Sequence, residues 1–317
     1  MTTNGRRVSF GLKTSQANTT YGEILRIWRE ADEVPVFEHA WLWDHLVPLR
    51  GEVTGAALEA WTLLAALAAQ TTRLRLGVIV TSNRIRRPAV LAKMAATVDI
   101  VAGGRLEFGI GAGGSEVPDP AGAALVHREY DAYGIEVVTP SEAVAALGEA
   151  CTIVKRMWAE DAPFDFAGRY YGLTGAICEP KPLQRPGPPI TIGAAGERAA
   201  LRVVAEHADI WNCPTRGDVA EFRHKSAVLD EHCAAIGRDP SEIVRSVQVL
   251  VATSASGGAA PSDGVLPRFF DPAATRELLL ELIDAGARRL ILAPVGSYPS
   301  VQWLADEIVE PVLASIP

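Results

Sequence analysis

Hydrophobic and polar positions follow two alternating patterns along the chain. Short runs of apolar, often β-branched residues are typical of strands buried on both faces, and longer segments with apolar residues three or four positions apart are typical of helices. The first pattern predicts strands at residues 8–14, 40–43, 74–81, 106–110, 190–194, 209–213, 243–253 and 290–294. The second predicts helices from 19 or 20 to 34 and at 58–70, 88–102, 141–160, 198–207, 219–236, 273–285 and 301–315.

Capping signals support these helices. A hydroxyl of Thr19 or Thr20 suits the N-cap of the first helix, and Ser141 suits the N-cap of the fourth. Pro88 stands where the first turn of the third helix tolerates proline. Local chemistry and periodicity therefore agree on where the helices begin.

The order of the elements predicts an α/β fold, because eight strands alternate with eight helices. The 317 residues exceed the roughly 250 of a typical (β/α)8 TIM barrel, and the surplus falls in expected insertion segments. These are residues 45–57, 115–140, 164–187 and 255–270, of which 164–171 suits an extended excursion or a hairpin. We predict a single barrel domain over residues 1–317. A two-domain doubly wound protein is the alternative, but no composition shift marks its boundary.

The excess of acidic over basic residues argues against some classes of binding partner. With 38 acidic and 30 basic residues the formal net charge is -8, which opposes general affinity for nucleic acid or anionic membranes. The longest apolar stretch, residues 60–69, is too short to span a bilayer, and no apolar segment of a signal peptide follows Arg7. The four cysteines are scattered without CxxC spacing. We therefore expect a soluble, cytoplasmic protein that is neither exported nor anchored in a membrane.

A strand-end motif offers the first candidate chemistry. Alternation along residues 38–45 would place His39, Trp41, Trp43 and His45 on one face, with Asp44 on the other. Asp44 and His45 fall at the C-terminal end of the strand, where barrel active sites lie. A carboxylate beside a histidine suits proton transfer or hydrogen bonding to a ring system. The alternative is an aspartate that caps a loop beside a histidine without a role.

Two glycine-containing turns are candidate cofactor sites. Gly109 to Gly114 matches GxGxxG after a strand, but residues 115–120 break the helix that a dinucleotide fingerprint needs. We favour close approach of this backbone to a flat cofactor. The loop from Gly193 to Arg198 joins a strand to a helix and suits a phosphate. For both segments the alternative is an ordinary turn.

Three guanidinium groups, Arg84, Arg86 and Arg87, stand together in an acidic protein and indicate a polyanionic ligand, although a solvated charged turn is nearly as common. The sequence has no GxSxG, HExxH or GxxxxGK[ST] motif, which argues against hydrolase, zincin and P-loop chemistry. The six histidines show no ligand spacing, and no metal is predicted.

Taken in order, several segments carry a family resemblance over nearly the whole chain. They are Trp43-Asp44-His45, residues 88–99 with Gly103-Gly104-Arg105-Leu106 behind them, Gly109 to Gly113, Tyr133-Gly134, Gly168-Arg169-Tyr170-Tyr171, Pro180-Lys181-Pro182 and Ala208 to Asn212. On these motifs the chain resembles the luciferase-like flavin and deazaflavin oxidoreductases, and more narrowly the branch that uses coenzyme F420. Relatives with this barrel use either FMN or F420.

The resemblance implies a barrel with insertions, often a homodimer, and assigns residues to a site. Asp44 would contact the deazaflavin ring and His45 would lie near the reacting carbon, both as catalytic residues. A non-prolyl cis peptide at Ile79-Val80 would support the ring. The full implied cofactor set is Asp44, Ile79, Val80, Thr81, Asn83, Gly111, Ala112, Gly113, Ala195, Gly196 and Arg198, and the implied substrate set is Trp43, His127, Tyr130, Tyr133 and Trp211. The arginine cluster would meet the oligoglutamate tail that F420 carries and FMN lacks.

The resemblance also orders the possible functions. The first is an oxidoreductase that passes a hydride between coenzyme F420 and a small organic substrate, with a separate reductase for the cofactor. The second is an FMNH2-dependent two-component monooxygenase, and the third is a non-catalytic flavin-binding protein. In the sugar-phosphate dehydrogenases of the F420 branch, a tryptophan and a glutamate occupy the places of Leu49 and Gly114, which argues against sugar-phosphate oxidation here.

Overall fold

Parallel strands close into a barrel in the computed structural model, which describes residues 7–49, 52, 54–116, 120–215, 217–252, 272–295 and 300–316. The strand order is β3-β2-β1-β11-β10-β9-β8-β5-β4, and pairing of β3 with β5 closes the ring. The strands are β1 (Ser9–Lys13), β2 (Phe37–Leu42), β3 (Arg75–Val78), β4 (Thr81–Ser82), β5 (Leu106–Gly111), β8 (Ile190–Gly193), β9 (Ile210–Cys213), β10 (Val244–Ala252) and β11 (Arg289–Val295). Since only Ile79 and Val80 separate β3 from β4, the two form one interrupted strand, and the predicted eight-stranded barrel is confirmed.

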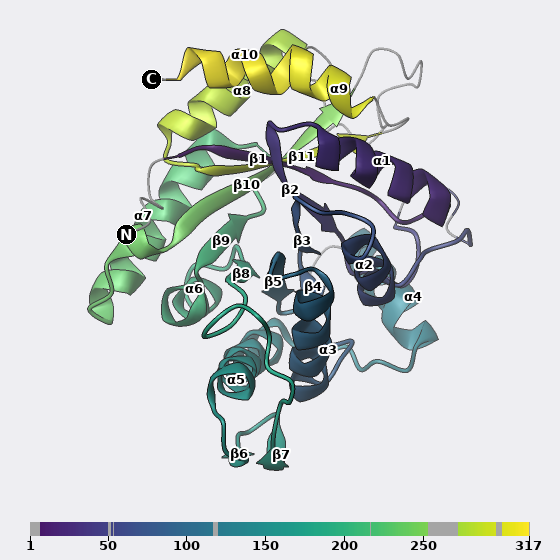
Figure 1. Cartoon of the computed structure of the whole chain (residues 1–317). Coiled ribbons are helices and arrows are strands. Elements are labelled where there is room, and N and C mark those ends of the chain that lie inside the picture. Colours follow the sequence, from purple (N-terminus) through teal and green to yellow (C-terminus); the bar gives the residue numbers. More distant parts are fainter. Residues whose placement is uncertain are drawn as a thin grey trace.

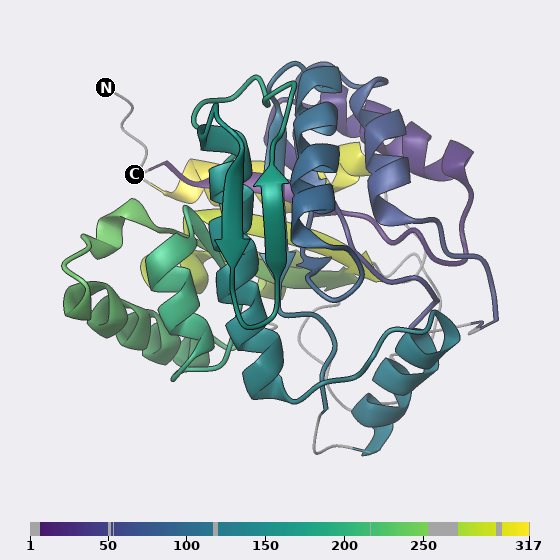
Figure 2. The ribbon, with the colours of Figure 1, turned by 90° about the horizontal axis from the view of Figure 1, so that it is seen from below.

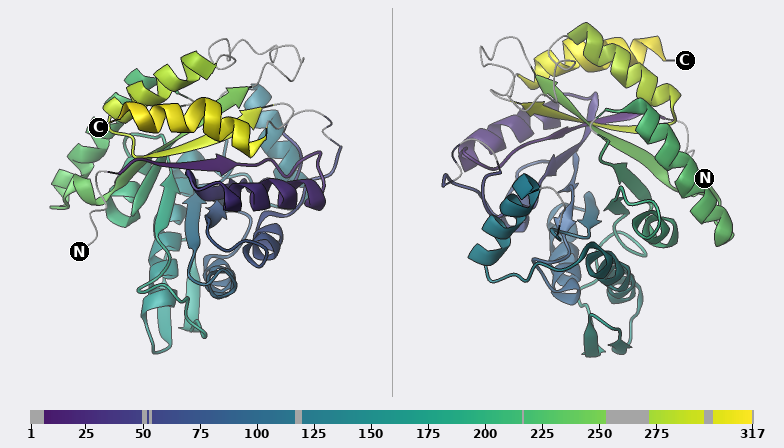
Figure 3. Two further views of the ribbon diagram at one scale, coloured as in Figure 1. Left: turned by 45° about the horizontal axis from the view of Figure 1, so that its top comes forward. Right: turned by 180° about the vertical axis from the view of Figure 1, so that it is seen from behind.

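Helices surround the barrel on its outside (Figures 1 and 3). They are α1 (Tyr21–Glu33), α2 (Ala60–Ala68), α3 (Pro88–Val101), α5 (Pro140–Ala159), α6 (Ala200–His207), α7 (Val219–Ala235), α8 (Pro272–Asp284), α9 (Val301–Leu304) and α10 (Glu310–Ser315), with a π-helical turn at Ala305–Val309 and a 3-10 turn at Pro240–Glu242. Thr20 caps α1 in a capping box with Glu23. The predicted cap Ser141 is wrong: Thr139 caps α5, because Pro140 fills the first helical position and Glu142 completes the capping box.

Two of the predicted insertions carry structure of their own. The segment between β5 and α5 contains a helix that the sequence analysis did not predict, α4 (Pro120–Ala132), which Figure 2 shows set apart from the helices of the barrel wall. The predicted hairpin is confirmed as the antiparallel pair β6 (Phe164–Ala167) and β7 (Gly172–Ala176). The predicted loop 255–270 lies outside the described residues.

The inward face of the barrel is unusually poor in side chains on one side. Gly111 of β5 and Gly193 of β8 face the interrupted strand, where the peptide bond Ile79-Val80 is cis as expected from the resemblance. A Cβ atom at Gly111 would lie 2.7 Å from Val80 Cγ2, and one at Gly193 would lie 3.0 Å from both Val80 methyl groups. The glycines therefore make the room that Val80 occupies.

Charged residues fill the end of the barrel where the strands begin. The fully buried carboxylate of Glu107 accepts from Arg75 Nε at 2.5 Å and lies 2.8 Å from Arg289 Nη2. Trp41 Nε1 donates to His39 Nδ1 at 2.7 Å. Burial, with Arg289 and Arg75 nearby, lowers the pKa of His39 well below its ordinary value, so the imidazole is neutral. These contacts close the N-terminal end and leave the opposite end for a site.

Candidate active site

The C-terminal strand ends bring the predicted cofactor segments together. Ser82 of β4 pairs with Gly111 of β5, and Gly111 pairs in turn with Gly193 of β8. The turn after Gly111 and the loop after Gly193 therefore follow neighbouring strands at the same level. Asp44 lies close by, since Ser82 N donates to Asp44 Oδ2 at 2.9 Å.

Asp44 is held by protein groups rather than free for a cofactor. Arg86 donates to both carboxylate oxygens, at 2.7 and 3.0 Å, and also to Glu59. Asp44 and Arg86 are both buried from solvent to nine-tenths or more, with side-chain exposures of 1% and 10%. A bidentate pair of this kind fixes the geometry of both partners. The structure thus shows Asp44 and Arg86 bound to each other at the strand ends, while contact of Asp44 with a cofactor stays a prediction.

His45 forms a dyad with a residue of α4. The buried carboxylate of Glu129 lies 3.0 Å from His45 Nδ1 and also accepts from Leu46 N at 2.5 Å. A carboxylate accepts here, so Nδ1 carries the hydrogen that points to Glu129. The ring of Trp43 stands 4.7 Å from the His45 ring. The Glu129 carboxylate and the Trp43 ring thereby fix the orientation of the His45 ring.

Tyr130 fastens α4 to the glycine turn. Its hydroxyl lies 2.8 Å from Ser82 Oγ and accepts from Gly114 N at 2.5 Å. Burial raises the pKa of Tyr130. A Cβ atom at Gly113, where φ is 85°, would lie 2.4 Å from Ser82 Oγ, so only glycine fits this turn. Tyr130 therefore holds the turn in place and does not line a substrate cavity as predicted.

The loop after β8 is open to an anion. Gly196, Arg198 and Ala199 are exposed, and Ala199 gives α6 no side-chain cap. Helix N-termini attract anions when their amide groups lack other partners. The neighbouring Ala195 is tied down instead, because Lys225 Nζ donates to its carbonyl oxygen at 2.8 Å.

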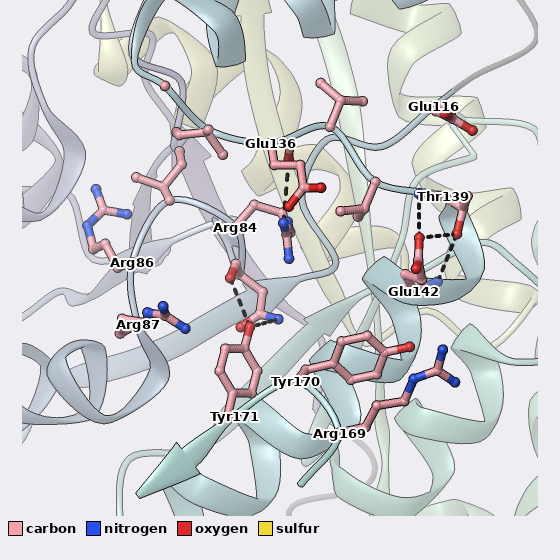
Figure 4. A pocket seen from close by; sticks show the side chains of 16 residues that line it. Arg84, Arg86, Arg87, Glu116, Glu136, Thr139, Glu142, Arg169, Tyr170 and Tyr171 are labelled. Atoms are coloured by element: carbon pink, nitrogen blue, oxygen red, sulfur yellow. Dashed lines mark hydrogen bonds between the residues drawn. The ribbon is translucent and has the colours of Figure 1, made fainter.

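A cavity of about 620 Å³ lies beside the end of β4, between α5 and the β6–β7 hairpin. Arg84, Arg87 and Arg169 line it together with Tyr170 and Tyr171, and Figure 4 shows Arg84 near its centre and Arg86 at its edge, pointing away. Glu116, Glu136 and Glu142 also line it. The Glu142 carboxylate is engaged, since it accepts from Thr139. The cavity therefore brings several guanidinium groups together with three glutamates, of which Glu142 is already engaged.

Other predicted site residues have different surroundings. Trp211 packs against Phe222 of α7 with stacked rings 6.0 Å apart, on the outer face of the barrel, which corrects its predicted place in a substrate cavity. Thr81 Oγ1 accepts from Trp61 Nε1 at 3.0 Å and also faces the helices. Asn83 Nδ2 donates to Tyr171 Oη at 3.0 Å.

The remaining two substrate candidates lie on or beside α4. His127 is exposed and its Nδ1 lies 3.3 Å from the Asp131 carboxylate. Tyr133 is exposed as well, and its hydroxyl donates to the Leu46 carbonyl at 3.3 Å. Of the predicted substrate set, only Trp43 stands at the mouth beside His45.

Sequence reasoning gave no role to several polar residues that the structure brings into the barrel interior or against His45. They are Lys13, Gln248, Asn212 and Glu129. For Lys13 the signal was present, because it ends the otherwise apolar strand β1. For Glu129 no signal existed without α4, which brings it across 84 residues to His45.

Among the described residues no cluster of three or more metal-binding side chains is found. In the same part of the chain no helix has the length and apolar character needed to cross a membrane.

Comparison with known proteins gives one family. A family model described as luciferase-like monooxygenase matches residues 7–264. An F420-dependent glucose-6-phosphate dehydrogenase of Kineococcus radiotolerans is 30% identical over 251 residues, covering 78% of this chain and 68% of that protein. A phthiodiolone/phenolphthiodiolone dimycocerosates ketoreductase of Mycobacterium sp. (strain JLS) is 32% identical over 206 residues, which are 63% of this chain and 50% of the ketoreductase. The chain thus spans only about half the length of such ketoreductases.

Solved structures share the fold. An F420-dependent secondary alcohol dehydrogenase in complex with an F420-acetone adduct aligns with a TM-score of 0.78 at 18% identity, covering 97% of this chain and 99% of that one. A long-chain alkane monooxygenase aligns with a TM-score of 0.76 at 14% identity, covering 99% and 92%. At these identities the similarity extends to the barrel alone.

Proposed function

Because the chain belongs to the luciferase-like monooxygenase family, we propose that it is an oxidoreductase that transfers a hydride between coenzyme F420 and a small organic substrate at the C-terminal mouth of its barrel. The observation that carries the choice of cofactor is the arginine-lined cavity beside β4. FMN ends at its phosphate, whereas F420 continues into an anionic oligoglutamate tail that needs such a cavity.

The residues of the mouth fit this cofactor. The turn at Gly111 to Gly113 and the open N-terminus of α6 offer backbone amides to a phosphate, on neighbouring strands. Arg84, Arg87 and Arg169 would hold the tail through charge-assisted hydrogen bonds. Ile79 and Val80 present an apolar surface to a flat ring, since both belong to the interior that Trp41 and Ile291 also line.

The protein supplies position, shelter and a proton. When bound, coenzyme F420 provides a carbon that gives or accepts a hydride. Glu129 orients His45, and His45 Nε2 gives a proton to the substrate oxygen or takes one from it. Asp44 and Arg86 fix the strand ends on which the other groups stand.

The test is a fluorescence titration of the purified protein with F420 and with FMN. We expect F420 to bind more tightly, and the triple variant R84Q/R87Q/R169Q to weaken F420 binding at least tenfold while leaving FMN binding unchanged. Arg202→Gln removes one guanidinium group from the exposed face of α6, away from the cavity, and should change neither. Tighter binding of FMN by an order of magnitude would overturn the proposal and favour an FMNH2-dependent monooxygenase that consumes oxygen.

The proposed enzyme acts as a homodimer in the cytoplasm and receives its reduced cofactor from a separate reductase. Support for the dimer comes from exposed apolar residues on and beside α3, namely Val90, Val101, Ile177 and Leu183. Leu183 lies against the end of α3, since a Cβ at Gly104 would be 3.9 Å from its Cβ. Sedimentation of Val90→Glu/Leu183→Glu as a monomer, against a wild-type dimer, would support this surface.

A further inference from the structure

A chain of polar side chains crosses the barrel interior beneath the mouth. Lys13 Nζ donates to Gln248 Oε1 at 2.8 Å, Gln248 Nε2 donates to Asn212 Oδ1 at 2.8 Å, and Asn212 Nδ2 donates to Ser246 Oγ at 3.2 Å. The side-chain amide oxygens of Gln248 and Asn212 both lie on the side of their amide groups that faces Lys13. The three strands β1, β10 and β9 therefore hold the ammonium group in one place and orient dipoles that favour its charge.

Lys13 keeps donors free. An ammonium group donates three hydrogen bonds, and among the described residues only Gln248 is seen to accept one. Among the same residues no carboxylate forms an ion pair with Lys13. The Lys13 side chain is partly exposed, so its remaining donors are accessible from solvent.

The interior around Lys13 carries excess positive charge. Among the described residues, Lys13, Arg75 and Arg289 lie there with the carboxylate of Glu107, and His39 is neutral. Glu107 is already shared by the two arginines, so it does not compensate Lys13. Although the protein has a formal net charge of -8, this interior is a region of positive electrostatic potential that attracts an anion.

Apart from the polar side chains linked through Gln248, small and apolar residues line the interior near Lys13. Gly77 and Gly109 present no side chain to the interior, and Trp41 and Ile291 line it. An ammonium group that is partly removed from water and has no carboxylate partner is unfavourable, because it loses hydration without gaining an opposite charge. A ligand that supplies the missing negative charge explains why a lysine stands here.

We propose that Lys13, held by Gln248, binds a carboxylate group of the substrate, so that the enzyme acts on small organic acids. The inference deepens the proposed function, because it takes the barrel mouth as the substrate site. It places the acid group at the floor of the mouth and the reacting carbon nearer the strand ends, where His45 stands.

The experiment uses the apoprotein and two probes of one shape, benzoate and its neutral amide, benzamide. Calorimetric titration should show benzoate binding at least tenfold more tightly than benzamide. Lys13→Met should abolish that preference, and Gln248→Met should reduce it, while Lys93→Gln on the outside of α3 should leave it unchanged. Thermal melts of each variant report whether the fold is kept.

Equal binding of benzoate and benzamide, or a benzoate preference that survives Lys13→Met, would overturn the inference. Because no cofactor is present, the result is separate from the F420 titration. A benzoate preference that depends on Lys13 would stand even if FMN proved to be the cofactor, and a failure here would leave the F420 proposal intact.

Discussion

The two ends of the barrel interior hold charge in opposite ways. At the N-terminal end, Glu107 is surrounded by Arg75 and Arg289, so that each buried charge meets an opposite one. Near the mouth, Lys13 meets only the amide oxygen of Gln248 among the described residues. The paired charges at the N-terminal end stabilise the fold. The unpaired ammonium group of Lys13 lowers stability but leaves a positive charge available to bind an anionic ligand. This agrees with the division of labour in barrels, where the N-terminal face supports stability and the C-terminal face carries function.

The largest effect is expected at the paired end. Glu107→Gln removes the carboxylate and leaves two guanidinium groups facing each other in the interior. Breaking a buried ion pair in this way lowers the free energy of unfolding by about 3 to 5 kcal/mol. Urea denaturation followed by tryptophan fluorescence measures it. Glu206→Gln, which breaks a surface pair with Arg202, should cost less than about 1 kcal/mol. Similar losses in both variants would show that the buried ion pairs at the N-terminal end contribute no more to stability than a surface pair does.

At the mouth, His45→Ala should leave stability nearly unchanged and slow turnover about a hundredfold or more, because a placed general acid or base contributes at least that much. The cofactor dissociation constant should stay within about twofold, since the loss falls on the proton and not on cofactor contacts. Steady-state kinetics with an identified substrate, together with a cofactor titration, separate the two quantities. Unchanged turnover would leave His45 as a packing partner of Trp43.

Removal of the unpaired charge should act in the opposite sense to Glu107→Gln. Burial lowers the pKa of Lys13 from 10.5 to about 8, so Lys13→Met should raise the free energy of unfolding at pH 7 by about 1 to 3 kcal/mol. Between pH 8 and 10.5 the unfolded lysine binds a proton that the folded one has released, so wild-type stability rises with pH there.

The advantage of Lys13→Met is therefore expected below pH 8 and should shrink as the pH rises through that window. Denaturation curves of both proteins at pH 7 and pH 10 test this. A variant less stable than wild type at pH 7 would show that Lys13 is a structural residue.

The sequence was sufficient for the barrel and insufficient for its interior. Strand positions followed from apolar runs, yet β2 begins at Phe37, three residues before the predicted start, because the polar Glu38 and His39 hide the strand. His39 is tolerated in the buried strand because its imidazole is neutral and accepts a hydrogen bond from Trp41 Nε1. The helix α4 was missed because Pro120 and Gly122, residues typical of loops, stand in its first turn.

Side-chain direction explains the errors at the site. Asp44 was expected to face a cofactor, but its partner Arg86 comes from a loop 42 residues away that no local pattern connects to it. Trp211 was counted with the mouth, although alternation along β9 turns it to α7 and leaves Asn212 inward. A single sequence predicts that residues alternate along a strand, but the closed sheet decides which set faces inside.

The smallest predicted effect concerns the link between α4 and the mouth. Glu129→Gln keeps the shape of the side chain but removes the charge that favours hydrogen on His45 Nδ1, so turnover should fall about tenfold, less than in His45→Ala. The ¹⁵N resonances of His45 should shift toward the other tautomer, a change that a purely structural role would not produce. Asp131→Asn breaks the equivalent contact to His127 on the exposed face of the same helix and should leave the His45 resonances in place. If the His45 resonances stay unchanged in both variants, α4 serves only to hold the glycine turn through Tyr130. Proton transfer at the mouth would then depend only on residues at the strand ends.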